Sequence, residues 1–219
     1  MSRVLTACFA WVTICSTSLA GNSGFAIRDH DRVVFLGDSI TEQKLYTAYV
    51  EAYTVTRFPG QEFHFWNSGW GGDTSWLRMR SGPNEKALFA ATGAEQEKLA
   101  KQAVDPCISR DVISYKPTLV MVNYGMNDHN YEAFREDIFR AYVCCQNEIA
   151  GMLTKAGSRV VLLTPQPIDR PGARPDKDPS NQSLRRFGLG LKKIASRNGA
   201  SFINQFDPYM SIMLRAHSG

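Results

Sequence analysis

The stretch of sequence that decides the fold is Val33-Val34-Phe35-Leu36-Gly37-Asp38-Ser39-Ile40-Thr41. Its first four residues are β-branched or large and apolar, and the glycine after them predicts a buried strand that ends in a tight turn. The composition of residues 41–57 then predicts a helix. Ser39 therefore lies at a strand-to-helix junction, where free backbone N–H groups and the positive end of a helix dipole favour negative charge on a nearby oxygen. A serine nucleophile that generates an oxyanion would benefit from this position.

The same residues also fit a purely structural interpretation. Ser39-Ile40-Thr41-Glu42 matches the capping-box pattern S-x-x-E, in which both polar side chains satisfy free N–H groups at the start of a helix. The tetrapeptide alone favours this interpretation. The choice between a cap and a nucleophile therefore depends on what else lies at the same end of the sheet.

Two further blocks rich in glycine and asparagine follow predicted strands. The block from Asn67 to Thr74 follows a strand at residues 62–66, and its three glycines within residues 69–72 predict unusual backbone angles or close backbone contacts. A plain glycine-rich turn is the alternative. The block from Tyr124 to Asp128 follows a continuous apolar strand at residues 118–123, which is typical of a parallel strand covered on both faces.

Three tryptophans, Trp66, Trp70 and Trp76, flank the second block. Their rings could stack on sugar rings, because a tryptophan combines a large apolar face with a polar N–H group. Packing in the core is the alternative, and we expect it for at least two of the three.

Strands and helices alternate along the whole chain. Further strands are predicted at residues 159–163 and 201–204. Helices are predicted at residues 84–116, 131–155 and 180–198, with Asp105 and Pro106 as the cap and the break that divide the first. This alternation predicts a single doubly wound, flavodoxin-like α/β domain of three layers, with a mostly parallel sheet of about five strands. The ligand site of such a sheet lies beyond the carboxyl ends of its strands, where all three blocks converge.

The composition is that of an ordinary globular protein. Hydrophobic residues make up 43% and charged residues 21% of the 219 residues, a length that suits one domain with a full core. The formal net charge of +4 is modest and its lysines and arginines are dispersed, which argues against nucleic acid as a partner. No Cys-x-x-Cys spacing or Cys/His cluster occurs, and His64 and His129 stand apart, so we predict no metal site.

The N-terminus has the pattern of a secretory signal. Arg3 precedes an uncharged, largely apolar segment at residues 4–16, and Ser18-Leu19-Ala20 supplies a small-x-small cleavage site. The apolar part is shorter than the roughly 20 residues that span a bilayer. We therefore expect residues 1–20 to be a signal peptide and residues 21–219 to be a secreted or periplasmic domain without stable membrane insertion.

Three cysteines, Cys107, Cys144 and Cys145, would remain after cleavage of the signal. An odd number cannot pair completely within one chain. Cys107 could join one of the adjacent pair in an oxidising compartment, or all three could be buried, inert thiols.

The three blocks together resemble the SGNH hydrolases, also called the GDSL esterase/lipase family. By this resemblance Ser39 is the nucleophile that attacks an ester carbonyl. The resemblance makes Gly72 a backbone N–H donor and Asn127 a side-chain amide donor to the oxyanion. Asp38 and Asp128 are the supporting acidic residues of the Gly-Asp-Ser and Gly-x-Asn-Asp motifs. The match extends over most of the chain that follows the predicted signal.

One block of the family pattern is absent from these 219 residues. The family carries an Asp-x-x-His block that supplies the general base and the carboxylate that orients it. Asp207 and His217 are the closest pair in the expected region, and His129, expected to be an exposed loop histidine, follows the third block; we predict neither histidine to be the base. The resemblance therefore predicts an SGNH domain whose C-terminal block would lie beyond Gly219, and a chain that is by itself a weak catalyst.

These features predict an exported serine esterase that needs no metal or cofactor. The resemblance favours acetyl or short-acyl groups on a carbohydrate, with a small molecule or a polysaccharide as the substrate. One alternative is a lipase or thioesterase that acts on longer acyl chains. Another is a non-catalytic carbohydrate-binding member of the fold, which the absent Asp-x-x-His block would favour. A phosphate-binding domain is disfavoured, because no Gly-x-Gly-x-x-Gly or Walker loop follows the first strand.

Overall fold

The computed structural model describes residues 25–217, so the predicted signal at residues 1–20 lies outside the described residues. Five strands alternate with helices along this part of the chain. In chain order the elements are β1 (Asp31–Gly37), α1 (Ser39–Glu42), α2 (Leu45–Arg57), β2 (Phe63–Gly69), α3 (Arg78–Ser81), α4 (Glu85–Ala90), α5 (Gly93–Asp111), η1 (Ile113–Tyr115), β3 (Leu119–Asn123), α6 (Glu136–Lys155), β4 (Arg159–Leu163), η2 (Pro175–Lys177), α7 (Pro179–Asn198), β5 (Ser201–Ile203) and α8 (Phe206–Ala216).

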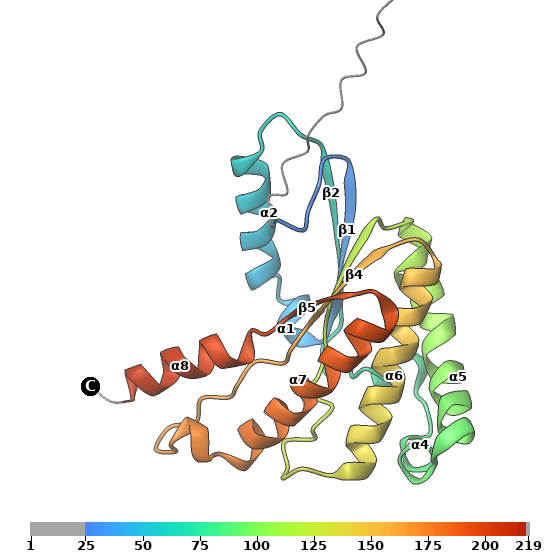
Figure 1. Ribbon diagram of the computed structural model, residues 1–219, viewed down its shortest axis with the longest axis vertical. Helices are drawn as coiled ribbons and strands as arrows, with labels where there is room; N and C mark the ends of the chain where they lie inside the picture. Colours follow the sequence, from blue (N-terminus) through green and yellow to red (C-terminus); the bar gives the residue numbers. More distant parts are fainter. Residues whose placement is uncertain (1–24, 218–219) are drawn as a thin grey trace, which may run out of the picture.

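The five strands form one sheet in the order β2-β1-β3-β4-β5, and every neighbouring pair is parallel. Helices α5, α6 and α7 cover one face of the sheet and α2 lies on the other (Figure 1). Helix α8 extends away from the sheet in the same view. The predicted fold class, a three-layer, doubly wound α/β domain with a parallel sheet of five strands, is therefore confirmed.

The apolar run in β1 follows from burial on both faces of the sheet. Val34 and Leu36 belong to the large core cluster, whereas Val33 and Phe35 belong to a second cluster that includes Tyr46 of α2. All four strand residues are 0% exposed. Full burial of such a side chain stabilises the fold by about 1.5–3 kcal/mol, which is why a central parallel strand is apolar throughout rather than alternating.

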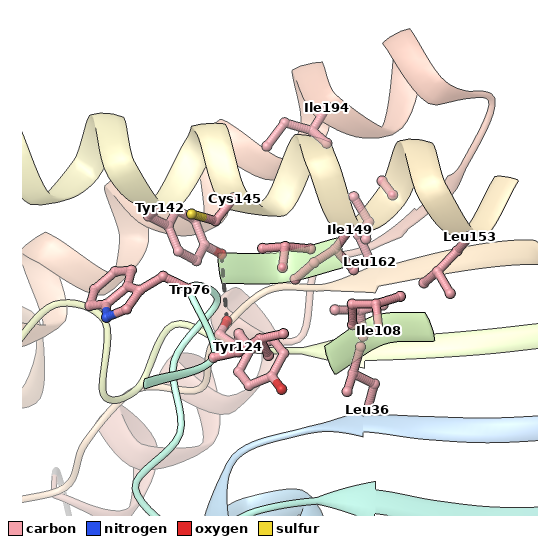
Figure 2. Close-up of a cluster of buried hydrophobic side chains, with 14 of the residues drawn as sticks. Leu36, Trp76, Ile108, Tyr124, Tyr142, Cys145, Ile149, Leu153, Leu162 and Ile194 are labelled. Carbon is pink, nitrogen blue, oxygen red and sulfur yellow. Dashed lines mark hydrogen bonds between the residues drawn. The ribbon is translucent and has the colours of Figure 1, made fainter. Parts of the chain in front are cut away.

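The larger core fills the space between the sheet and the helices that cover it (Figure 2). Leu36 and Leu162 come from the strands, Ile108 from α5, and Ile149 and Leu153 from α6. Tyr124 and Tyr142 close the end of this core that faces the candidate site, where the Tyr142 hydroxyl donates a long hydrogen bond of 3.5 Å to the Tyr124 carbonyl oxygen. The core therefore holds the residue that begins the third block.

Pro106 does not break the helix that contains it, and this prediction was wrong. α5 continues through Pro106, and Asp105 forms an ion pair of 2.6 Å with Lys101 instead of capping a new helix. A proline removes one backbone N–H group. Val104 and Cys107, on either side of it, are both buried in the core, so their packing offsets that loss.

Two predicted helices differ at their N-terminal ends, and the reason is the same in both. The helix expected at residues 41–57 is split, because Lys44 adopts a left-handed φ of 62° between α1 and α2. The helix expected from residue 131 cannot include Tyr131, because Asn130 and Tyr131 also have left-handed φ values of 59° and 57°, and it begins at Glu136. Such angles cannot continue a right-handed helix.

The three cysteines of the described chain are free, so the alternative of unpaired thiols holds. Cys107 and Cys145 are buried, and burial raises the pKa of both thiols. No helix in residues 25–217 has the length and apolar character needed to cross a bilayer.

Candidate active site

The three sequence blocks lie side by side because their strands are neighbours. Gly37, the last residue of β1, pairs with Gly69 of β2 on one side and with Asn123 of β3 on the other. The Trp70 N–H group donates a hydrogen bond of 3.0 Å to the Gly37 carbonyl oxygen, which brings the second block against the first. Parallel strands that end at the same edge therefore place all three blocks beyond their carboxyl ends.

Gly37 itself is required by this close approach. A β-carbon at this position would lie 2.2 Å from the Thr41 Oγ1 atom and 2.6 Å from the Asn123 carbonyl oxygen. Both distances are far shorter than van der Waals contact. The glycine therefore lets the turn after β1 fold back tightly against β3.

Ser39 is the first residue of α1 and is half-buried. The cap of this short helix is Asp38, whose carboxylate accepts a hydrogen bond of 3.0 Å from the Ile40 N–H group. The capping-box interpretation of Ser39 is therefore wrong, and within residues 25–217 the Ser39 hydroxyl forms no structural hydrogen bond. The helix that begins at Ser39 is shorter than predicted, because α1 has four residues and Lys44 separates it from α2, so its dipole is that of a single turn.

Asn127 of the third block is held to the second block. Its Nδ2 atom donates a hydrogen bond of 2.8 Å to the Asp73 carbonyl oxygen, and its Oδ1 atom accepts one of 3.1 Å from the Tyr131 hydroxyl. An amide nitrogen carries two hydrogens, so one N–H of Asn127 stays available. Gly72 is exposed with a left-handed φ of 75°, and its N–H group forms no hydrogen bond with the rest of the described chain.

A buried arginine that the sequence analysis missed supports the second block. The Arg80 side chain is 2% exposed, and its Nε atom lies 2.7 Å from the Oδ2 atom of Asp73, whose side chain is 0% exposed. Its Nη2 atom donates a hydrogen bond of 2.6 Å to the Ser68 carbonyl oxygen. Tyr124 adds a hydroxyl donor to the same Asp73 oxygen at 3.2 Å. The side chain of Asp73, the residue after Gly72, is therefore held by two residues from different parts of the chain.

Asp128, the last residue of the third block, is also buried. It accepts a hydrogen bond of 2.9 Å from the Ser75 N–H group through Oδ1, whereas Oδ2 has no partner within residues 25–217. Burial raises its pKa to about 6. Asp128 thus ties the third block to the chain that follows Gly72 and Asp73.

The pKa of Asp38 is also raised by its surroundings. Burial, followed by the charges of Asp128 and Asp73, raises the pKa of Asp38 from 3.8 to about 7. Between these two pH values the folded protein keeps a proton that the unfolded chain has lost, so the free energy of unfolding falls as the pH rises through this window. Asp38 is therefore a cap that destabilises the fold when it ionises.

Neither histidine considered in the sequence is a partner of Ser39. His129 is buried at 2% exposure, which corrects the expectation of an exposed loop histidine. Its Nδ1 atom lies 3.3 Å from the Gly125 carbonyl oxygen, and burial lowers its pKa. His217 caps the far end of α8 and forms a hydrogen bond of 2.8 Å with Asp169. Within residues 25–217, no histidine forms a hydrogen bond with Ser39.

The three tryptophans divide as the sequence analysis expected. Trp76 is fully buried and Trp66 packs against the core, whereas Trp70 is 46% exposed directly after β2. The Arg80 guanidinium lies 5.5 Å from the centre of the Trp70 ring. Three cavities, of about 480 Å³ and about 430 Å³ between α5 and α6 and of about 350 Å³ against α8, are not lined by Ser39, Gly72 or Asn127.

The comparison with protein families agrees with this arrangement of blocks. Residues 35–216 match the GDSL-like Lipase/Acylhydrolase family, and the chain belongs to this family. The resemblance stated from the sequence is therefore confirmed, and the family places the chain in the class of carboxylic ester hydrolases. A comparison with curated protein sequences finds no match.

Solved structures share the fold at low identity. One is BT4096, a gut microbial diltiazem-metabolizing enzyme, with 24% identity and a TM-score of 0.67 over 88% of this chain; the match covers 40% of BT4096. A variant of Axe2, an acetyl-xylooligosaccharide esterase from Geobacillus stearothermophilus, has 20% identity and a TM-score of 0.64 over 86% of this chain and 82% of its own. Axe2 was also solved as catalytic mutants in which a serine, an aspartate or a histidine is replaced by alanine.

Proposed function

We propose that this chain is an exported serine esterase that hydrolyses carboxylic esters, with Ser39 as the nucleophile. The observation that carries the proposal is the free Ser39 hydroxyl at the sheet edge where Gly72 and Asn127 also lie. Both residues offer an N–H group without an acceptor in the described chain. Acyl transfer requires a nucleophile and free N–H donors at one site, and these groups share one edge of the sheet.

The proposed reaction has two steps. The Ser39 oxygen attacks the ester carbonyl carbon, and the resulting oxyanion accepts hydrogen bonds from the N–H groups of Ser39 and Gly72 and from the Asn127 amide. The alcohol then leaves with a proton, and water hydrolyses the acyl-serine to free the acid. In serine hydrolases a histidine takes the serine proton and later donates it to the leaving group.

Carbohydrate esters with acetyl or other short-acyl groups are the proposed substrates. The similarity to an acetylxylan esterase supports this substrate class. So does the exposed Trp70 ring within the second block, because an exposed aromatic face binds sugar rings well. A small molecule or a polysaccharide would serve equally as the carrier of the ester. The proposed export rests on the signal pattern in residues 1–20 and is tested by the N-terminus of the protein recovered from the culture medium or periplasm.

A specific observation favours a second candidate, a carbohydrate-binding protein without catalysis. No histidine within residues 25–217 forms a hydrogen bond with Ser39. A serine without a base keeps its proton near neutral pH and reacts slowly. The two candidates differ in the reactivity of one hydroxyl group.

A covalent probe separates these candidates. A fluorophosphonate should label the full chain and the control variant Ser114→Ala, which changes an exposed serine, but not Ser39→Ala. Ser39→Ala should also lose hydrolysis of p-nitrophenyl acetate while its melting temperature stays unchanged. Full activity of Ser39→Ala would rule out Ser39 as the nucleophile. An unlabelled but folded wild-type chain that binds xylo-oligosaccharides would support the second candidate.

A further inference from the structure

Tyr131 lies in an unusual turn directly after the third block. Asn130 and Tyr131 both adopt left-handed φ values, of 59° and 57°. Asparagine tolerates this region, but a tyrosine enters it only where the surrounding contacts require it. Strain of this kind collects at functional sites, because the rest of the fold holds it in place.

The contacts of Tyr131 identify the interaction that this turn makes possible. Its ring lies 5.0 Å from the buried ring of His129, and yet its side chain as a whole is 52% exposed. Burial of apolar surface therefore does not account for the conformation. The hydroxyl, by contrast, donates a hydrogen bond of 3.1 Å to the Oδ1 atom of Asn127.

This hydrogen bond fixes one end of the Asn127 amide. The other end, Nδ2, donates to the Asp73 carbonyl oxygen at 2.8 Å. An amide held at both its oxygen and its nitrogen cannot exchange the two by rotation. The remaining N–H of Nδ2 then keeps a single direction.

The hydroxyl of Tyr131 also lies within electrostatic range of the first block. Burial and the charge of Asp38, the residue before Ser39, raise the pKa of Tyr131. The hydroxyl therefore remains protonated, and remains a donor to Asn127, at neutral and moderately alkaline pH. A protonated hydroxyl is the state that its hydrogen bond to Asn127 requires.

We propose that Tyr131 is a positioning residue for ester hydrolysis, whose hydroxyl orients the Asn127 amide so that its free N–H serves the oxyanion. The inference rests on the proposed role of Asn127. Without the hydroxyl, only the Asp73 carbonyl oxygen holds the amide, so the direction of its free N–H group is less tightly fixed. The loss would appear in the transition state and not in the binding of the uncharged ester.

Tyr131→Phe tests the proposal because it removes the hydroxyl and keeps the ring. We expect kcat on p-nitrophenyl acetate to fall about 3- to 10-fold, the scale of one ordinary hydrogen bond, with KM unchanged. The matched control is Tyr115→Phe, since Tyr115 is 43% exposed and stacks on Trp66 at 5.5 Å, and this variant should keep wild-type kinetics. In an Asn127→Ala background, Tyr131→Phe should cause no further loss.

Two kinetic results would overturn the proposal: an unchanged kcat for Tyr131→Phe, or the same fold-loss with and without Asn127. In either case Ser39→Ala and Asn127→Ala could still be inactive, so the proposed function would stand. A second readout is the Asn127 side-chain amide signal in ¹H–¹⁵N NMR, assigned by its absence in Asn127→Ala. Tyr131→Phe should move and broaden this signal, and an unchanged signal would contradict the proposal even if the wild-type chain hydrolysed no ester.

Discussion

Replacing the buried Arg80 by methionine should lower the free energy of unfolding by about 3–5 kcal/mol, because it leaves a buried carboxylate without its cation. The magnitude follows from the burial of both partners, whose side chains are 2% and 0% exposed at a separation of 2.7 Å. Methionine keeps much of the apolar stem of arginine. Asp73 would retain only neutral donors, namely the Tyr124 hydroxyl and the Met79 N–H group.

Arg110→Met is the matched control for this variant. Arg110 and Arg80 both pair with Asp111, but the Arg110 side chain is 61% exposed. An exposed ion pair contributes about 0–1 kcal/mol. Urea denaturation at pH 7, followed by tryptophan fluorescence, gives both free energies by linear extrapolation.

A double variant identifies the cause of the loss. If the unpaired charge of Asp73 is responsible, Arg80→Met combined with Asp73→Asn should be more stable than Arg80→Met alone. The reasoning is refuted if Arg80→Met loses no more than Arg110→Met, or if the second substitution recovers nothing. A loss that stays the same in the double variant would indicate lost packing of the arginine stem instead.

Asn127→Ala should lower kcat about 10²- to 10³-fold on p-nitrophenyl acetate with little change in KM, as expected for one oxyanion donor; an unchanged kcat with a lower melting temperature would make Asn127 a turn residue. Gly125→Ala should lower the free energy of unfolding by about 1–3 kcal/mol, since its φ is 131° and a β-carbon would lie 2.9 Å from Pro165 Cγ. Gly60→Ala, with open space around it, serves as its control in the same denaturation assay. Asp38→Asn keeps the cap acceptor but cannot ionise, so its stability relative to wild type should rise as the pH increases from 3.8 towards 7, with exposed Glu97→Gln as the control; parallel melting curves across this range would contradict the raised pKa.

The sheet and the position of its three blocks were predictable because local residues determine both. A run such as Val33 to Leu36 has few alternatives to a strand buried on both faces. Glycines at the strand end, such as Gly37, mark the place where backbones approach closely. All neighbouring strands run parallel, so their carboxyl ends meet at one edge of the sheet.

The interruptions of helices were not predictable for a physical reason. Lys44 and Tyr131 adopt left-handed angles that their own side chains disfavour, so residue preferences alone predict a continuous helix at both positions. Tyr131 is the clearer case, since its hydroxyl bonds to Asn127 across the turn. Pro106 shows the opposite, because core packing maintains a helix that the local sequence would end.

The burial of particular polar and charged side chains could not be predicted from the sequence either. Arg80 follows the glycine-rich block with no local pattern that separates it from the partly exposed Arg78, and His129 resembles any polar loop residue. Arg80 is buried against partners that include Asp111, 31 residues further along the chain, whereas His129 is buried by the turn that brings its ring to the Gly125 carbonyl oxygen. Sequence periodicity reports which face of an element is apolar, but not which polar side chain finds a partner there.

The three buried aspartates of the site explain why the buried Arg80 matters for the proposed chemistry. Asp38, Asp73 and Asp128 are all buried near one another, and negative charge there opposes the formation of an oxyanion next to Ser39. Arg80 neutralises Asp73, and burial raises the pKa of Asp38 to about 7, so Asp38 carries only part of its charge at neutral pH. Asp128, whose pKa is raised to about 6, is mostly ionised there. The Asn127 amide can then donate to the oxyanion without a competing field from three carboxylates. The arginine that stabilises the fold therefore also makes the proposed chemistry electrostatically possible.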